Sequence, residues 1–468
     1  MASQAVVERS AITESGRSPR VDQAALVDAL VNRAVAAQRQ IESWSEERID
    51  RLLRALGESV AERAQALAAA TVEETGIGNI HDKTLKITVA GLGVAAELEG
   101  KVGYGEISFD SDRQIAEIAS PVGVVVGLIP ATHPVATFIF KALIAIKARN
   151  AIILSPSRRA QRVSQQVGVM IQRVLHEMGA PVALVQWTAE ENTRETTTAL
   201  MSHKQVGMVL ATGGRAMVEA AYRSGKPAIG VGPGNAPALI AADADLPHVA
   251  RSVVQSKSFD NGLVCGAENH LVVDASVRPA FISELEGRGA AVLTESEAAR
   301  FLVAAVDRET HRFKRPVIGQ DASTLAEWAH IERPYTIQLL VVPTEAVAPG
   351  NYLTAEKLAP VVSLIAVPDM DEGLNVCGAL LDIDGTGHTA IIHTQSADLV
   401  RRFSTTIRAS RILVNTPATQ GLLGLTTGLT ASFTLGPGTW GGSSTTNSVT
   451  YLDLLNIKRV AYHTIKTI

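Results

Sequence analysis

The sequence predicts an α/β protein built on parallel, doubly wound sheets, and three observations support this fold class. Short runs rich in valine and isoleucine, typical of buried strands, begin near residue 121. Segments of about 10 to 15 residues with helical character separate them, an alternation typical of parallel sheets. A second series of such runs follows Ala241, in a chain whose 468 residues are too many for one ordinary core. We therefore expect at least two domains.

The N-terminal part is predicted to be helical over residues 21–67. Apolar residues from Ile49 onward recur at spacings of three and four, which places them on one helix face. Ser45, followed by two glutamates, predicts an N-cap with acids in the first turn. Gly76 and Gly78 are expected to end this helical region.

The strand–helix alternation then follows the chain in order. PVGVVVGLIP predicts a strand, residues 135–149 a helix, NAIILS a strand and residues 159–178 a helix. PVALVQW, QVGMVLAT and PAIGVG continue the first series, and the second comprises HLVVD, IQLLVVP, VVSLIAV, HTAIIHT and RILVNT. The C-terminal residues close with an alternating run. This run predicts a strand that pairs with the edge of its own sheet or with another chain.

Composition and charge exclude several classes of function. Hydrophobic residues make up 46% of the chain and charged residues 19%, as in soluble globular proteins. The net charge of −4 gives no basic surplus, so we expect no nucleic-acid partner. No apolar run approaches the ~20 residues of a membrane span. Residues 1–20 lack the apolar core of a signal peptide, and two cysteines form no disulfide framework, so we expect a flexible extension on a cytoplasmic protein.

The two cysteines lie in contrasting surroundings. Cys265 lies in a polar loop before a predicted strand, where Gly262 and Gly266 permit close approach of backbone and substrate. The residues alone fit a nucleophilic thiol and a small buried filler equally well. Cys377, in GLNVCGALL, has apolar helical neighbours and is expected to be a buried structural thiol. The histidines and cysteines show no ligand spacing such as CxxC or HExxH, so no metal site is predicted.

Five motifs together identify a resemblance that none would carry alone. They are SGKPAIGVGPGN at 224–235, FDNGLVC at 259–265, EKLAP at 356–360, RILVNTP at 411–417, and TWGG at 439–442 followed by LLNIK at 454–458. From about Val21 onward the chain resembles the CoA-acylating aldehyde dehydrogenases. These include propionaldehyde and sulfoacetaldehyde dehydrogenases and the aldehyde half of bifunctional aldehyde/alcohol dehydrogenases. Because the chain ends at Ile468, we expect no iron-dependent alcohol domain.

The resemblance implies an aldehyde dehydrogenase-like fold with a Rossmann-type cofactor domain, a second α/β catalytic domain and a small oligomerisation strand region. A homo-oligomer is expected, as is usual in the family. The expected segments are a flexible extension (1–20), the N-terminal helices with the dinucleotide-binding domain (21–240), the catalytic domain (241–435), and a C-terminal segment that returns to the cofactor domain and ends in the oligomerisation strand (436–468).

The resemblance also implies the chemistry. The Cys265 thiolate attacks an aldehyde, hydride passes to NAD, and the thiol of coenzyme A takes the acyl group from the resulting thioester. In IGVGPGN, Gly230 occupies the position at which hydrolytic aldehyde dehydrogenases carry a water-activating glutamate. Because glycine cannot act as a base, this substitution favours CoA over water.

Two alternatives stay open. One is a hydrolytic enzyme that gives free acid. The other is a degenerate cargo protein bound to a microcompartment shell, since some relatives carry N-terminal targeting peptides; residues 1–20, however, lack an amphipathic pattern. The sequence also leaves open which short aldehyde is the substrate, with propionaldehyde, acetaldehyde and sulfoacetaldehyde among the candidates.

Three further catalytic candidates accompany Cys265. His133, in PATHPVAT, stands where relatives usually carry an oxyanion-binding asparagine, and a neutral imidazole N–H could donate in its place. Asn261 lies in the thiol loop. His388, in GHTAIIHT, is a candidate to assist the CoA thiol, although such histidines are more often core or hinge residues.

The resemblance places the cofactor against several short segments. Residues 212–214 form a glycine turn between a strand and a helix, which suits a phosphate. Glu356 matches the glutamate that holds the nicotinamide ribose. Arg158 and Arg159 could meet a 2′-phosphate, so NADP is an alternative to NAD. The predicted cofactor contacts are Ile129, Pro130, Ala131, Thr132, Ser155, Pro156, Ser157, Thr212, Gly213, Gly214, Val231, Gly232, Glu356 and Leu358.

Overall fold

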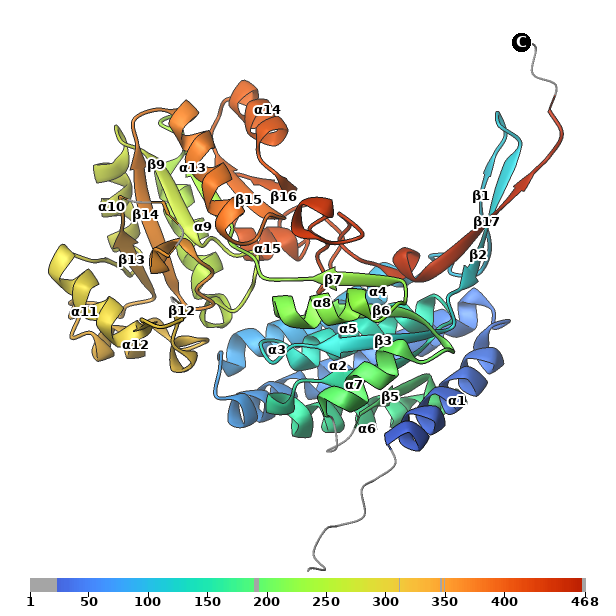
Figure 1. Cartoon of the computed structure of the whole chain (residues 1–468). Helices are drawn as coiled ribbons and strands as arrows, with labels where there is room; N and C mark the ends of the chain where they lie inside the picture. The colour runs from blue at the N-terminus through green and yellow to red at the C-terminus, as the bar shows by residue number, and fades with distance from the viewer. Residues whose placement is uncertain (1–22, 189–192, 311, 346, 349, 465–468) are drawn as a thin grey trace, which may run out of the picture.

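The computed structural model describes residues 23–188, 193–310, 312–345, 347–348 and 350–464, and the expected extension at 1–20 lies outside them. Two lobes each enclose a parallel sheet, and a small antiparallel sheet projects from the first lobe as an arm (Figure 1). The predicted α/β fold class is confirmed.

The first lobe contains a five-stranded parallel sheet in the order β5-β4-β3-β6-β7. Strands that follow β3 in the chain lie first on one side of it and then on the other, so the topological switch point lies between β3 and β6. In open α/β sheets, ligands bind outside the carboxyl ends of the strands at such a point. The strands are β3 (Val124–Ile129), β4 (Ala151–Pro156), β5 (Val185–Trp187), β6 (Val206–Thr212) and β7 (Ala228–Val231).

The long second helix begins and ends where the sequence predicts. Ser45 caps the long second helix by accepting a hydrogen bond from the N–H of Arg48, and Gly76 ends it with φ of 69°. The fifth helix carries buried residues along its whole length, because it is packed among its neighbours in the core. The helices of this lobe are α1 (Gln23–Ile41), α2 (Glu46–Thr75), α3 (Ile80–Thr88), α4 (Val94–Leu98), α5 (Pro134–Lys147), α6 (Gln161–Glu177), α7 (Arg194–Ser202) and α8 (Arg215–Arg223).

The second lobe contains a seven-stranded parallel sheet in the order β10-β13-β14-β9-β8-β15-β16. Five of its strands were predicted; β8 and β10, which are four and three residues long, were not. The strands are β8 (Pro237–Ile240), β9 (His270–Asp274), β10 (Ala290–Val292), β13 (Leu339–Pro343), β14 (Val361–Val367), β15 (Gly387–His393) and β16 (Ala409–Val414); a small separate pair joins β11 (Val306–Asp307) to β12 (Arg312–Phe313). The helices are α9 (Leu246–Ser258), α10 (Arg278–Glu286), α11 (Glu295–Ala305), α12 (Ala322–Trp328), α13 (Met370–Ile383), α14 (Ala397–Thr406) and α15 (Ala418–Leu422).

The arm is an antiparallel sheet of β1 (Gly105–Asp110), β2 (Ile115–Pro121) and β17 (Leu455–Ala461). The predicted terminal strand is thus present, and it pairs with β2 of its own chain. Before reaching the arm, the chain returns to the first lobe, where Val449 and Leu454 pack in the core. The other two strands were not predicted, because most of their residues are at least partly exposed and their sequence lacks an apolar run.

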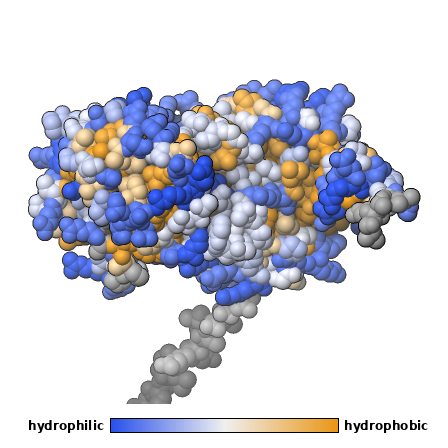
Figure 2. Space-filling view, turned by 90° about the horizontal axis from the view of Figure 1, so that it is seen from above, coloured by the Kyte–Doolittle hydropathy of each residue, from blue (hydrophilic) through white to orange (hydrophobic). Residues whose placement is uncertain are grey.

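The surface of the molecule shows hydrophilic and hydrophobic side chains interspersed over both lobes on the face drawn in Figure 2. Among the described residues, no helix combines the length and the apolar character needed to cross a membrane.

Candidate active site

Cys265 lies in the loop between a short 3-10 turn, Phe259–Gly262, and β9, at the N-terminal edge of the second sheet. Close backbone approaches explain the surrounding glycines. A Cβ on Gly234 would lie 1.8 Å from the carbonyl oxygen of Cys265, and one on Gly262, where φ is 72°, would lie 2.3 Å from the carbonyl oxygen of Ala359. The glycines therefore allow neighbouring segments to close around the thiol loop.

His388, at the start of β15, faces the thiol. Its Nε2 lies 3.3 Å from Cys265 Sγ, and its Nδ1 lies 2.9 Å from Thr389 Oγ1. If Nδ1 carries the ring proton, Nε2 is free to accept a hydrogen bond from the thiol. The sequence suggested a role for His388 with the CoA thiol; the structure places it against the enzyme's own thiol.

Burial keeps both members of this pair uncharged at neutral pH. The Cys265 side chain retains some exposure, yet the surrounding protein raises the pKa of its thiol to about 12, an effect that Glu356 increases and Arg411 opposes. Burial and the charge of Arg411 lower the pKa of His388 to about 3. Forming the thiolate therefore requires a proton acceptor, and His388 is in position to be one.

Arg411 donates hydrogen bonds to the backbone beside this pair, and sequence analysis did not identify it as a site residue. Its guanidinium donates to the carbonyl of His388 at 2.8 Å and to that of Gly436 at 2.8 Å. The only sequence signal was a charged residue at the head of the apolar run RILV, since arginine is rarely buried without partners.

Glu356 lies before β14 on the other side of the thiol loop. It accepts a hydrogen bond of 2.9 Å from the N–H of Gly234, the residue that touches Cys265. Burial raises the pKa of Glu356 to about 8. Leu358, two residues on, has φ of 45°, and its carbonyl accepts a hydrogen bond from Gly319. The structure thus brings the EKLAP motif beside the cysteine motif.

Gly230, the residue predicted to stand in place of a water-activating glutamate, lies in closely packed surroundings. A Cβ on Gly230, in β7, would lie 2.5 Å from Cγ1 of Val218 and 2.8 Å from Cε2 of Tyr222. The Tyr222 hydroxyl also accepts a hydrogen bond from the Gly230 N–H. A side chain does not fit here without a shift of its neighbours.

The comparisons with known proteins identify the family. The profile of the aldehyde dehydrogenase family matches residues 3–451. The chain belongs to that family. Aldehyde-alcohol dehydrogenase 2 of Entamoeba histolytica is 37% identical over 93% of this chain and 51% of its own length. Sulfoacetaldehyde dehydrogenase of an Acholeplasma species is 36% identical over 92% of this chain and 90% of its own.

Among solved structures, an acetylating aldehyde dehydrogenase from Geobacillus thermoglucosidasius superimposes with a TM-score of 0.92 at 36% identity, over 97% of this chain and 99% of that one. The resemblance to acylating aldehyde dehydrogenases is therefore confirmed. The chain spans about half the length of the bifunctional aldehyde-alcohol dehydrogenases it matches.

Most predicted cofactor residues of this aldehyde dehydrogenase lie at one edge of the first sheet, whereas Glu356 and Leu358 lie before β14 of the second. Residues 129–132, 155–157, 212–214 and 231–232 follow the carboxyl ends of β3, β4, β6 and β7. Gly214 is the N-cap of α8 and supplies no side-chain cap, so backbone N–H groups at this helix start can meet a phosphate. A Cβ on Gly214 or on Gly232 would meet open space. This edge therefore fits a nicotinamide dinucleotide.

Three hydroxyl groups of that set already have protein partners. Thr212 Oγ1 lies 3.2 Å from Thr434 Oγ1, and Ser155 Oγ lies 3.1 Å from Thr197 Oγ1. Ser157 Oγ accepts from the N–H of Arg159.

His133 is the N-cap residue of α5, directly after the loop that ends β3. Its Nδ1 is buried and has no hydrogen-bond partner among the described residues. Burial and the charges of Lys86, Lys83 and Lys141 lower the pKa of His133 well below its ordinary value. The imidazole is therefore neutral and retains an N–H that can donate.

Asn261 adopts φ of 54°, and its side chain is occupied within the protein. The amide nitrogen donates to the carbonyl of Gly319 at 2.9 Å, and the amide oxygen accepts from Asn79 at 3.3 Å. These bonds hold the thiol loop; direct participation of Asn261 in the reaction stays a prediction.

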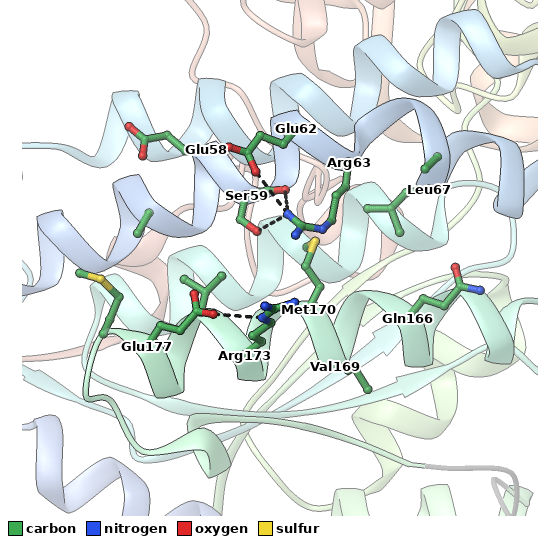
Figure 3. Close-up of a pocket in the computed structure, with 14 residues that line it drawn as sticks. Glu58, Ser59, Glu62, Arg63, Leu67, Gln166, Val169, Met170, Arg173 and Glu177 are labelled. Atoms are coloured by element: carbon green, nitrogen blue, oxygen red, sulfur yellow. Dashed lines mark hydrogen bonds and ion pairs between the residues drawn. The ribbon is translucent and has the colours of Figure 1, made fainter.

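Cys377 lies on α13 with no exposed surface, among the apolar side chains of the second lobe. Within the described ranges, no group of three or more histidine, cysteine or acidic residues is arranged to hold a metal ion. A groove of about 590 Å³ runs between α2 and α6 (Figure 3), but its lining residues lie within 55–67 and 166–178 and include none of the predicted site residues.

Proposed function

We propose that this aldehyde dehydrogenase oxidises a short aldehyde with NAD and coenzyme A, giving an acyl-CoA and NADH. The observation that carries the proposal is the 3.3 Å contact between Cys265 Sγ and His388 Nε2, in a site whose Gly230 position leaves no room for a water-activating side chain. Relatives described as acetylating and as a sulfoacetaldehyde dehydrogenase support the same reaction.

His388 first accepts the thiol proton, and Cys265 attacks the aldehyde carbon to give a thiohemiacetal. The backbone N–H of Cys265 and the neutral imidazole of His133 are the proposed donors to the developing oxyanion. The nicotinamide, when bound, supplies the hydride acceptor. Collapse of the oxyanion with transfer of its hydride leaves a thioester on Cys265, and the thiol proton held by His388 passes to solvent.

The CoA thiol then attacks this thioester, and the Cys265 thiol is released with the proton that the CoA thiol gives up. Because no side chain at position 230 activates water, the thioester persists until CoA arrives. We assign Glu356 to the nicotinamide ribose and the glycine turn at residues 212–214 to the cofactor phosphates. NADP stays an alternative.

The experiment that tests the proposal measures products. Purified protein is incubated with propionaldehyde, acetaldehyde or sulfoacetaldehyde, with NAD or NADP, and with or without CoA. Acyl-CoA formed at the rate of NADH release supports the proposal. Free acid formed at full rate without CoA indicates the hydrolytic alternative, and no NADH with any aldehyde indicates a degenerate site.

We also infer a homo-oligomer in the cytoplasm. Strand β17 is an edge strand of the arm, and most of its residues are exposed, so its outer side can pair with a second copy. Deletion of residues 455–468 should lower the mass measured by light scattering. Encapsulation in a bacterial microcompartment is a separate proposal about residues 1–20, which deletion of those residues and co-sedimentation with shells would test.

A further inference from the structure

Three charged side chains are buried together beside the thiol loop. Lys83 and Lys86 belong to α3 in the first lobe, and both form ion pairs with Asp260, five residues before Cys265; their side chains are at most 4% exposed. A buried ion cluster is costly to desolvate, and replacing such charges by apolar groups is often neutral for stability. Its presence here needs a reason beyond stability.

Lys83 connects the two loops from which the site is built. Its Nζ lies 3.1 Å from Oδ2 of Asp260, in the thiol loop, and donates at 3.3 Å to the carbonyl of Thr132, the residue before His133. Burial and the charge of Lys86 lower the pKa of Lys83 to about 8, while Asp260 opposes this shift, so the ammonium is retained at neutral pH. One charged group thus spans the thiol loop and the loop of the proposed oxyanion donor.

The backbone before Cys265 is strained at Asp260, the residue that pairs with Lys83, and at Asn261. Asp260 and Asn261 have φ of 46° and 54°, a region that residues other than glycine rarely adopt. Such strain persists at functional sites only where the surroundings over-determine it. Here α3 and its N-cap do so: the N–H of Asn79 donates to Asp260 Oδ1 at 3.1 Å, and Asp82 Oδ2 accepts from the Asp260 N–H at 2.7 Å.

The two lysines have different partners. Lys86 forms its ion pair with Asp260, whereas Lys83 reaches both Asp260 and the carbonyl of Thr132. Removing the ammonium of Lys83 therefore leaves Asp260 paired, with no orphaned charge, and breaks the connection to the His133 loop.

We propose that Lys83 is a positioning residue, which fixes the thiol loop relative to the loop of His133 and so sets where the thiol stands against the oxyanion donor. It acts through Asp260 and Thr132 and is not assigned a contact with substrate. This inference rests on the proposed function.

The test compares Lys83→Met with Lys147→Met. Lys147 is equally buried and also ion-paired, in its case with Asp50 at 2.5 Å and Glu46 at 3.2 Å, but it lies at the far end of α5 from His133. Loss of a buried ion-paired lysine should lower Tm in both variants. Because displacements of about 1 Å cost on the order of 100-fold in rate, Lys83→Met should lower kcat about 100-fold, with KM for NAD changed less than about threefold. Lys147→Met should retain kcat.

A kcat of Lys83→Met within about threefold of the unmodified protein, or an equal loss in Lys147→Met, overturns the proposal. Lys83→Gln, which keeps an N–H donor, is assayed alongside in case Lys83→Met does not fold. Its kcat should fall less than that of Lys83→Met. A fall in kcat to the level of a misfolded chain also counts against a positioning role for Lys83.

The rate of alkylation of Cys265 by iodoacetamide, followed by peptide mass spectrometry, separates this inference from the proposed function. It needs neither aldehyde nor cofactor. Lys83→Met should change that rate by at least about threefold, because the reactivity of a thiol depends on its surroundings, and Lys147→Met should leave it unchanged. If the unmodified protein shows no dehydrogenase activity but the alkylation difference appears, the proposed function fails and the positioning role stands.

Discussion

The two cysteines of this chain lie in two regions that differ in what burial does to a thiol. Cys377 is enclosed by apolar side chains on α13, whereas Cys265 lies in a loop at a sheet edge. Burial raises the thiol pKa at both positions, to about 12 for Cys265. Neither is therefore a low-pKa thiol in the resting protein.

What separates the two thiols is the neighbouring base. Cys265 has the imidazole of His388 at 3.3 Å. Among the described residues, Cys377 has no hydrogen bond to a side chain. The comparison indicates that nucleophilicity here depends on a positioned proton acceptor, which only one of the two regions supplies.

The largest expected effect distinguishes the regions directly. Cys265→Ser should lower the rate of NADH formation with aldehyde and CoA by on the order of 10⁴-fold, because the nucleophile is lost. Cys377→Ser should keep the rate within about threefold, since that thiol lies in a packed core. Initial rates of both purified variants check this. A Cys265→Ser protein with substantial activity would contradict the whole proposed reaction.

Removing the imidazole of His388 should make Cys265 as unreactive as a buried thiol without a neighbouring base. His388→Gln should lower kcat by about 10²- to 10⁴-fold at neutral pH. Because the thiol pKa is about 12, the thiolate fraction without a base rises about tenfold per pH unit, so the remaining rate should climb steadily from pH 7 to 10. A pH–rate profile measures this. A variant whose pH–rate profile has the same shape as that of the unmodified protein would show that His388 is not the proton acceptor.

Trapping the intermediate sharpens the comparison at the level of single residues. Protein mixed with aldehyde and NAD, without CoA, should carry an acyl adduct on Cys265 and none on Cys377, as read by peptide mass spectrometry. The adduct should outlast turnover by about 100-fold or more, because no general base at position 230 assists water. Absence of the adduct at position 265 would remove the basis of the proposal.

The smallest expected effect is on stability, and here Cys377 should matter more than Cys265. Cys377→Ser buries a hydroxyl in an apolar environment and should lower the free energy of unfolding by about 1–3 kcal/mol. Cys265→Ser, at a partly exposed position, should lower it by less than about 1 kcal/mol. Urea unfolding of the two variants provides the measurement. Equal destabilisation would mean that the two thiols are packed alike.

Prediction from sequence succeeded where the signal is local. The Ser45 cap, the Gly76 stop and strands β3 and β9 depend on residues close together in the chain. The structure places all of them as expected. It failed for β1, β2, β8 and β10, which are polar or very short. Arg411 and Lys83 were missed as members of the site for a related reason: their importance lies in partners far away along the chain.

The sequence by itself determined the alternation of strands and helices, the glycine-flanked thiol and the glycine at position 230. Only the tertiary structure decided that His388, 123 residues further along the chain, lies against Cys265, and that Lys83 joins the two loops. The physical reason is that parallel strands bring their equivalent ends to one edge of a sheet. Strand order, which no local pattern encodes, then selects the side chains that meet there.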